Sequence, residues 1–336
     1  MGTIAVSGLL DYAKELLVNV AREEAVGRPD RLKVRPMRSV LFVPGHRRDW
    51  IRKAERFGAD GIVLDLEDAV QPADRGAART IVKEELAELS RKVSSVWVRV
   101  NAAPEEMALD LEAAARPGTS VIMLPKAHGP ESILAAERLV GYYEGRNGLE
   151  LGSLVICPIL ETAGGVRTSY EIAMSSPRIE YMGAVVAPQG DTALALRMDV
   201  MSDAIGTESL YLRSKIVVDV RAAGMRYPIG GTVTDLSPEH RVLRPFAQMN
   251  KKIGHSGMMV IHPSHVSVVN EIYSSTPAEI EHALKVLAII RDSRQGGAIR
   301  GPVAGQMIDF AHARFSAQLL EEAESQGVHL PAGIDV

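Results

Sequence analysis

Residues 61–67 read GIVLDLE, a short apolar run that closes on acidic residues. Its length and its content of branched residues favour a β-strand. Because its apolar residues are continuous, both faces of the strand are expected to be buried, as in a parallel sheet. Asp65, Glu67 and Asp68 gather at its C-terminal end. The run therefore predicts a buried strand with acidic residues at its C-terminal end, at one edge of a sheet.

Runs of the same kind recur along the chain and are separated by helix-like segments. The seven others are SVLFVPG (39–45), SVWVRVN (95–101), SVIMLPK (120–126), LVICPILE (154–161), YMGAVVAP (181–188), MRYPIGG (225–231) and GMMVIHP (257–263). Helices are expected at 49–57, 130–143 and 207–223. This alternation predicts an α/β fold, a closed TIM (β/α)8 barrel. An open doubly wound sheet is the alternative, but the first strand lacks the G-x-G-x-x-G turn.

Two regions fall outside the predicted barrel, which spans residues 36–273. Residues 1–35 form an N-terminal extension with an amphipathic helix at 9–24, followed by a Gly-Arg-Pro-Asp break. Residues 274–336 form a C-terminal extension, which we expect to be a helical lid. Its two helices are predicted at 278–294 and 309–326, joined by a Gly-rich link.

The composition is that of an ordinary globular protein. Hydrophobic residues make up 46% of the chain, and the net charge is −4 with no basic stripe, which argues against nucleic acid or an anionic membrane as a partner. A single cysteine, Cys157, excludes an internal disulfide and is expected to be a packing residue in its apolar run. Asp11, Lys14 and Glu15 interrupt the apolar N-terminal stretch, so no signal peptide is predicted and a cytoplasmic location is expected.

Charged or polar residues follow one predicted strand after another. They are Asp65, Glu67, Asp68, Arg99, Asn101, Lys126, Glu161, Asp191 and His262. The starts of the strands carry no comparable set. Because the active sites of TIM barrels lie at the C-terminal ends of the strands, this asymmetry predicts one polar pocket at the barrel mouth.

Glu161 and Asp191 come from different strands and offer the oxygen ligands that Mg2+ prefers. Such an ion is a Lewis acid for a carbonyl or carboxylate. Arg99 offers a planar fork for substrate oxygens. Together they would stabilise the charge of an enolate.

Each of these residues also has a structural interpretation. Glu161 would serve in an ion pair, and Asp191 would cap the next helix. Arg99 would pair with Glu67 across adjacent strands. His262, in the word IHP, is expected to be packed rather than catalytic.

Several words of the sequence resemble those of one family, the citrate lyase β-subunit/malyl-CoA lyase family of the HpcH/HpaI aldolase superfamily. They are RSVLFVPG (38–45), GADGIVLDLEDAV (58–70), VRVN (98–101), MLPK (123–126), ILETAGGV (159–166), GMMVIHPSHVSVVNEIYSSTPAEIEHA (257–283) and GQMIDFAHA (305–313). The resemblance runs from about residue 36 to 325.

The resemblance implies a TIM barrel with a C-terminal helical lid, Mg2+ as cofactor, and a homotrimer or homohexamer. It implies an acyl-CoA thioester and a 2-oxo acid as partners. Glu161 and Asp191 match the metal ligands, and Arg99, Glu67 and Asp309 match catalytic positions. The residues that match the coenzyme A site are Phe42, Arg47, Arg48 and Lys126. Asp309 has its own alternative, because a helix is predicted to begin there and an aspartate is a good N-cap.

The expected reaction is cleavage, or formation, of a carbon–carbon bond next to a thioester carbonyl, of the malyl-CoA or citramalyl-CoA type. Alternatives are a citrate lyase β-subunit acting on an acyl carrier protein thioester, a malyl-CoA thioesterase or malate synthase, and a thioester-binding subunit without catalysis. The sequence departs from the family where Gly190 replaces the family's glutamate before Asp191.

Overall fold

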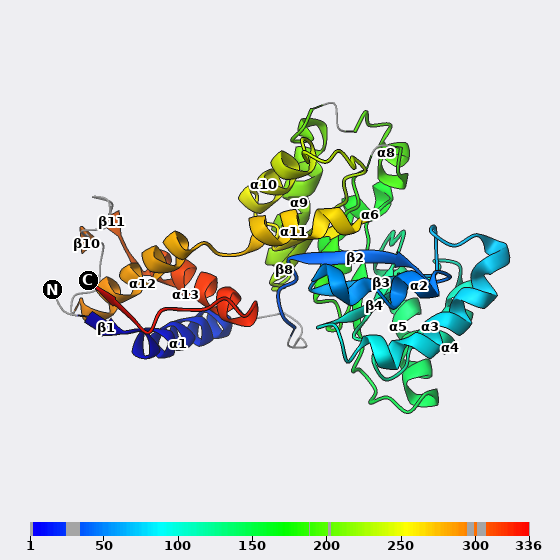
Figure 1. The fold of residues 1–336 in the computed structure, drawn as a ribbon, viewed down its shortest axis with the longest axis horizontal. Helices are drawn as coiled ribbons and strands as arrows, with labels where there is room; N and C mark the ends of the chain where they lie inside the picture. The colour runs from blue at the N-terminus through cyan, green and yellow to red at the C-terminus, as the bar shows by residue number, and fades with distance from the viewer. Residues whose placement is uncertain are drawn as a thin grey trace. The chain divides into compact units, whose positions relative to one another are not determined.

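The computed structural model describes residues 3–24, 34–187, 189–200, 203–293, 299–300 and 307–335. The chain divides into two compact units, one formed by Pro29–Tyr273 and the other by the two ends together, Met1–Arg28 and Ser274–Val336. Both units are drawn in Figure 1.

The larger unit is built on eight parallel strands. They are β2 (Ser39–Pro44), β3 (Gly61–Asp65), β4 (Val96–Arg99), β5 (Val121–Leu124), β6 (Val155–Pro158), β7 (Tyr181–Gly183), β8 (Tyr227–Gly230) and β9 (Gly257–Val260). Their order is β6-β5-β4-β3-β2-β9-β8-β7. Isolated parallel bridges, Ile156 with Ile179 and Ile159 with Gly183, join the two end strands. The predicted TIM-like barrel is therefore confirmed, and all eight strands lie in their predicted ranges.

The strands are buried on both faces, which explains their continuous apolar sequence. Val63 and Trp97 belong to the cluster inside the barrel, whereas Ile62 and Leu64 belong to the larger cluster that includes the helices. Cys157 is also buried inside, where burial raises the pKa of its thiol. This confirms the packing role predicted for the cysteine.

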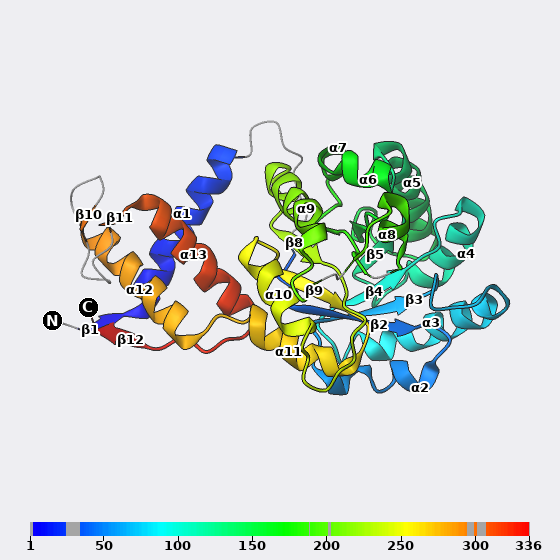
Figure 2. The ribbon, with the colours of Figure 1, turned by 90° about the horizontal axis from the view of Figure 1, so that it is seen from above.

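Helices follow the strands and cover the barrel, with α3, α4 and α5 outside the strands in Figure 2. The covering segments are α2 (Arg48–Ile51), η1 (Ala54–Phe57), η2 (Pro72–Asp74), α3 (Arg75–Leu89), α4 (Pro104–Ala114), α5 (Pro130–Arg146), α6 (Ala163–Arg167), α7 (Ser169–Met174), α8 (Asp191–Leu196), η3 (Thr207–Ser209), α9 (Leu210–Ala222), α10 (Leu243–Lys252) and α11 (Pro263–Tyr273). The single helix predicted at 49–57 is wrong, because α2 and η1 divide that segment. Across the described part of the chain, no helix is long and apolar enough to cross a membrane.

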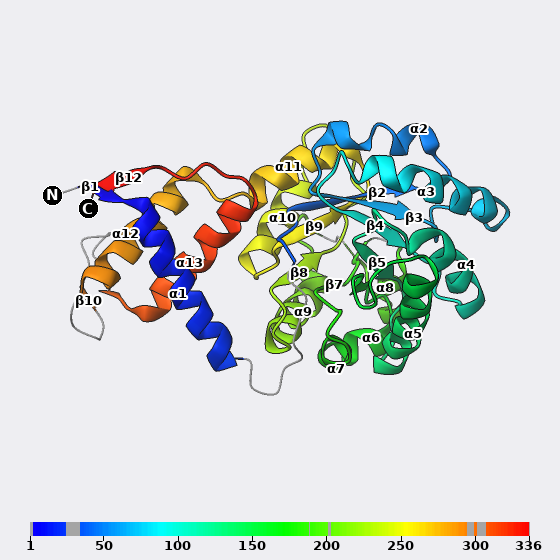
Figure 3. The same cartoon turned by 90° about the horizontal axis from the view of Figure 1, so that it is seen from below.

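The smaller unit has its own core and brings the two ends of the chain together. Its elements are β1 (Thr3–Ala5), α1 (Val6–Glu24), α12 (Pro277–Asp292), β10 (Ile299–Arg300), β11 (Met307–Ile308), α13 (Phe310–Ser325) and β12 (Gly333–Asp335). β1 pairs antiparallel with β12, and α1 packs against α12 and α13 (Figure 3). Leu9, Leu284 and Leu320 meet in the core. The predicted Gly-Arg-Pro-Asp break and most of the Gly-rich link lie outside the described residues.

A buried histidine makes the stability of the larger unit sensitive to acid. His255 is 4% exposed, and neither ring nitrogen has a partner at hydrogen-bond geometry among the described residues. Burial, reinforced by the charge of Arg213, lowers its pKa to about 4. In the unfolded chain the same ring takes up a proton near pH 6.5. Between these two values the unfolded state binds more protons than the folded state, so stability falls as the pH falls.

We predict that His255 contributes a loss of about 3 kcal/mol in the free energy of unfolding as the pH falls from 6.5 to 4. Urea unfolding gives the free energy of unfolding of the native protein and of His255→Gln across that pH range. The difference between the two slopes of this free energy against pH is the contribution of His255. Equal slopes in the two proteins would contradict the prediction, whatever the variant's stability at neutral pH.

Candidate functional site

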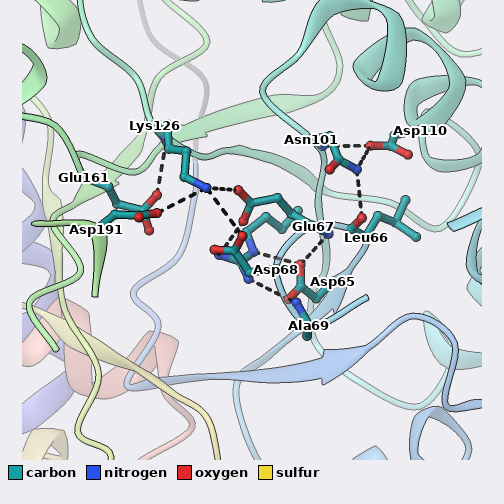
Figure 4. A network of polar contacts seen from close by, with 11 residues as sticks. Asp65, Leu66, Glu67, Asp68, Ala69, Asn101, Asp110, Lys126, Glu161 and Asp191 are labelled. Atoms are coloured by element: carbon teal, nitrogen blue, oxygen red, sulfur yellow. Dashed lines mark hydrogen bonds and ion pairs between the residues drawn. The ribbon is translucent and has the colours of Figure 1, made fainter. Parts of the chain in front are cut away.

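The C-terminal ends of the barrel strands carry a cluster of charged side chains, shown in Figure 4. Asp65 ends β3, and Glu67 and Asp68 follow it. Arg99 ends β4, Lys126 follows β5, Glu161 follows β6, and Asp191 begins α8. The structure thus brings together seven of the nine strand-end residues that the sequence singled out.

Asp65 and Arg99 form the buried centre of this cluster. They are register partners on the parallel strands β3 and β4, so their side chains leave the same face of the sheet. The guanidinium donates from Nε to Oδ1 at 2.8 Å and from Nη2 to Oδ2 at 2.6 Å. Burial is the largest single effect and lowers the pKa of Arg99, but the hydrogen bonds to Asp65 together with the charges of Asp65, Glu67 and Glu161 outweigh it and raise this pKa. The pair fixes the plane of the guanidinium, which also lies 5.0 Å from the centre of the Phe42 ring.

Glu67 is the second acidic neighbour of Arg99. Its Oε2 lies 3.0 Å from Nη1 of Arg99, but this buried oxygen makes no hydrogen bond in the described structure. Sequence reasoning named Glu67 as the residue that orients the arginine and gave Asp65 no such role. The signal was present, because residues 65 and 67 share one face of a strand. Asn101 does not join the cluster, because its amide binds the Leu66 carbonyl and Asp110 instead.

Lys126 lies among the carboxylates. Its Nζ donates to Glu67 Oε1 at 2.7 Å and lies 3.2 Å from Asp191 Oδ2 and 3.4 Å from Asp68 Oδ1. Its backbone N–H donates to Glu161 Oε2 at 3.3 Å. One residue therefore contacts acidic groups from β3, β6 and α8.

Glu161 and Asp191 both contact Lys126, Glu161 through the backbone N–H and Asp191 through Nζ, and their carboxyl groups overlap in the view of Figure 4. Glu161 is 5% exposed, and burial raises its pKa to about 7, with Glu67 and Asp191 adding to the rise against Arg99 and Lys126. Within the described residues, no side-chain nitrogen of a lysine or arginine lies within 4.0 Å of its carboxylate oxygens. Glu161 is thus a buried acid without a direct counter-charge.

Asp191 is the first residue of α8, whose N-cap is Gly190 with no side-chain cap. The alternative in which Asp191 caps the helix is therefore not what the structure shows. Its side chain is 41% exposed and turns toward Lys126 and Glu161. The substitution at Gly190 leaves the carboxyl of Asp191 in the cluster.

The donor set fits a hard divalent cation. Asp65, Glu67, Asp68, Glu161 and Asp191 bring five carboxyl groups to the mouth, against the two cationic side chains of Arg99 and Lys126. In the described ranges, no group of three or more acidic, histidine or cysteine side chains is placed so that it could hold a metal ion by itself. Mg2+ takes only one or two protein carboxylates and completes its shell with water and substrate oxygens. Glu161 and Asp191 match that requirement.

A cavity of about 600 Å³ opens beside Arg99. Its wall is largely apolar and includes Phe42, Trp50 and Phe57, with Lys53 and His262 as further polar members. Sequence reasoning found Phe42 but missed Trp50 and Lys53, which lie in and just after α2. Pockets with apolar walls and a few convergent polar groups are the usual form of small-molecule sites.

The other predicted coenzyme residues do not line this cavity. Arg48 pairs with Glu84 and Glu85 on α3, the latter at 2.6 Å. Arg47 lies 3.9 Å above the Trp50 ring and 3.4 Å from Asp49. Their part in binding a coenzyme stays a prediction.

His262 is exposed and lines the cavity, so the expectation that it is packed is wrong. The Ser264 N–H donates to its Nδ1 at 3.2 Å, and the Ser264 hydroxyl lies 2.8 Å from the same atom. An Nδ1 that accepts a hydrogen bond leaves the proton of the neutral ring on Nε2.

Asp309 belongs to the smaller unit and is the N-cap of α13. Its carboxylate accepts hydrogen bonds from the backbone N–H groups of Ala311 and His312. Hydrogen bonding from the His312 side chain, 2.7 Å away, lowers the pKa of Asp309. The capping alternative is therefore present in the structure, and a catalytic role stays a prediction.

Comparison with known proteins places these features in a family. Residues 38–263 match the model of the HpcH/HpaI aldolase/citrate lyase family. Citrate lyase subunit beta of Leuconostoc mesenteroides subsp. cremoris is 32% identical over 273 residues, which cover 81% of this chain and 88% of that protein. Mitochondrial citramalyl-CoA lyase of Rattus norvegicus is 30% identical, covering 82% of both chains. A (3S)-malyl-CoA thioesterase of Cereibacter sphaeroides is 28% identical, covering 86% of this chain and 95% of that one.

A solved structure agrees with this assignment. CitE of Mycobacterium tuberculosis, crystallised with magnesium, acetoacetate and coenzyme A, has a TM-score of 0.67 and 27% identity, covering 86% of this chain and 98% of that one. The resemblance noted in the sequence is confirmed: the chain belongs to the HpcH/HpaI aldolase/citrate lyase family.

Proposed function

We propose that the protein is a Mg2+-dependent carbon–carbon lyase that acts on acyl-CoA thioesters of the malyl-CoA or citramalyl-CoA type. The products would be acetyl-CoA and a 2-oxo acid. The observation that carries the proposal is the buried Glu161 carboxylate, which has no cationic side-chain group in direct contact among the described residues. It shares Lys126 as a neighbour with Asp191 and lies on the same rim as Arg99. A site of this kind provides a cation position next to a fixed guanidinium.

Glu161 and Asp191 would hold the metal ion. When bound, Mg2+ supplies Lewis acidity toward the carbonyl and carboxylate oxygens of a 2-oxo acid. The crystal complex of CitE with magnesium, acetoacetate and coenzyme A supports this choice of ion. The burial of Glu161 favours a bound cation, because a neighbouring positive charge offsets the penalty of holding the ionised carboxylate out of water.

Arg99 would hold the substrate oxygens that become negatively charged. Asp65 occupies the Nε and Nη2 edge, and Glu67 faces Nη1. A guanidinium has five N–H donors. The remaining N–H groups of Nη1 and Nη2 are available to a substrate, and Arg99 lines the cavity. Because two buried carboxylates fix its plane, the guanidinium needs no reorientation as an enolate forms.

The coenzyme arm would lie along the apolar cavity wall. Phe42 and Trp50 give this wall its aromatic surface, and Lys53 adds a positive charge that suits a phosphate. Arg47 lies over the Trp50 ring, close to this wall. Arg48, with its guanidinium held by α3, would act by keeping α2 in place.

Asp309 would serve as the proton-transferring group. The hydroxyl of the substrate must lose a proton when the carbon–carbon bond breaks, and an ionised carboxylate can accept it. Hydrogen bonding from His312 keeps Asp309 ionised at neutral pH. In this proposal the smaller unit acts as a lid over a barrel mouth, within a homotrimer or homohexamer, and shields the enolate from water.

Two other reactions have support from relatives. A citrate lyase β-subunit would use the same cluster on a thioester of an acyl carrier protein, as the relative from Leuconostoc indicates. A thioesterase would direct water at the thioester carbonyl, as the relative from Cereibacter indicates. The Gly190 departure is the one feature that favours a thioester-binding subunit without turnover.

A product assay separates these reactions. Purified protein is incubated with Mg2+, acetyl-CoA or propionyl-CoA, and glyoxylate or pyruvate, and the products are read by mass spectrometry. A condensed acyl-CoA supports the lyase, and free coenzyme A supports hydrolysis. Turnover that requires an acyl carrier protein supports the citrate lyase alternative. Failure to bind Mg2+ or any acyl-CoA would reject the proposed function.

We predict that Glu161→Gln weakens Mg2+ binding by about tenfold or more, because a charged oxygen ligand is replaced by a neutral one. Isothermal titration calorimetry measures the affinity. Glu150→Gln, which alters an exposed glutamate before β6, is the matched control and should bind Mg2+ as the native protein does. In EDTA above pH 7, Glu161→Gln should unfold at a higher temperature than the native protein, because the buried charge is gone. Unaltered Mg2+ affinity would remove Glu161 from the metal site.

Asp309 allows capping to be separated from catalysis. Asparagine is as good an N-cap as aspartate but cannot accept the proton, whereas alanine loses both functions. We predict that Asp309→Asn keeps the native melting temperature and lowers kcat by about a hundredfold or more. Asp309→Ala should lower both. Native kcat in Asp309→Asn would leave Asp309 with its capping role alone.

A further inference from the structure

Lys126 occupies an unusual backbone position at the barrel mouth. It has a φ of 55°, in the left-handed region that lysine seldom adopts. Leu124 ends β5, and Pro125 and Lys126 follow before the chain rejoins the neighbouring strand. Residues held in this sparsely populated region cluster at functional sites.

A one-residue bulge explains this conformation. The Ile159 N–H donates to the Leu124 carbonyl at 2.8 Å, and the Ile159 carbonyl accepts from the Ala127 N–H at 3.2 Å. In a regular parallel ladder the second bond would come from residue 126. Two residues, Pro125 and Lys126, therefore lie opposite Ile159 alone. Bulges of this kind re-aim a side chain near active sites.

The segment after β6 braces the bulge. The Thr162 hydroxyl donates to the Ala127 carbonyl at 3.3 Å. A Cβ added to Gly165 would lie 2.1 Å from the same oxygen, so only glycine allows α6 to approach this closely. The same segment carries Glu161. The bulge is thus packed against the segment that carries Glu161.

The bulge places a fixed positive charge inside an acidic cluster. The Lys126 ammonium contacts Glu67, Asp191 and Asp68, and its side chain is 34% exposed. Without this ammonium, Glu67, Asp68 and Asp191 would lose the cation that they share. Like charges at such separations repel strongly in a partly buried site.

We infer that Lys126 is a positioning residue whose ammonium acts as a built-in counter-cation, holding the acidic cluster together and competing with the divalent ion for its oxygens. This inference rests on the proposed function only in naming Mg2+ as that ion. An ammonium so close to Asp191 repels an incoming metal ion and must give up contact with that oxygen when the metal binds. Lys126 therefore lowers the affinity of the site for the metal ion. When the metal is absent, its ammonium holds the acidic side chains in place.

The first test compares Mg2+ affinity across variants by isothermal titration calorimetry. Lys126→Met removes the charge and keeps most of the side chain's length, whereas Lys126→Arg keeps the charge. We expect Lys126→Met to bind Mg2+ about tenfold more tightly than the native protein and Lys126→Arg to stay within about twofold of it. The control is Lys92→Met, since Lys92 pairs with Glu88 at 2.9 Å on the protein surface. Unchanged or weaker binding by Lys126→Met overturns the inference, as does tighter binding by Lys126→Arg.

The second test needs no metal. In EDTA, Lys126→Met should lower the melting temperature, because the acids it neutralised now repel one another. Adding Glu67→Gln to that variant should restore part of the loss, whereas Glu67→Gln alone should not stabilise the protein. Additive effects of the two substitutions overturn the inference, because contacting charges must couple. If the native protein binds no Mg2+, the proposed function fails, while this thermodynamic cycle still decides the role of Lys126.

Discussion

Closure of a parallel sheet forces the carboxyl ends of eight strands into one small region, and every other feature of the site depends on this. Side chains that are far apart in sequence, such as Asp65 and Arg99, become neighbours because their strands are adjacent in the barrel order. The constraint concentrates acids as well as bases. The mouth carries five carboxyl groups and two cationic side chains. Either a further cation must bind there, or some of the carboxyl groups must be protonated.

Arg99 and Lys126 neutralise different parts of the negative charge at the mouth. Arg99 pairs with Asp65 and Glu67, and such buried pairs contribute more to geometry than to stability, because desolvation cancels most of their attraction. Lys126 shares Glu67 with Arg99 and also contacts Asp191. Glu161 has no cationic side-chain group in direct contact among the described residues, and burial raises its pKa to about 7. Positive charge is therefore lacking beside Glu161, and a bound divalent ion would supply it.

The sequence predicted the barrel well because its evidence was redundant. Eight separate apolar runs each indicated a buried strand, and an error in one would not have changed the architecture. The acidic and basic residues at the strand ends were also found, since a charge after a buried strand is conspicuous. Asp65 was overlooked as the partner of Arg99 because it sits inside the apolar run, where the pairing becomes evident only from the register of β3 and β4.

The role of Lys126 could not be derived from sequence, because it depends on one irregular residue. MLPK reads as the end of an ordinary strand, and an ordinary strand would give Lys126 a regular place in the ladder. The extra residue opposite Ile159 changes the direction of the Lys126 side chain. No residue type in the run predicts this bulge. The nearest signal is Gly165, whose missing Cβ is required by the Ala127 carbonyl, yet that contact joins residues 38 positions apart. Local pattern fixes the elements of such a site, whereas the contacts between elements determine which acid each cation meets.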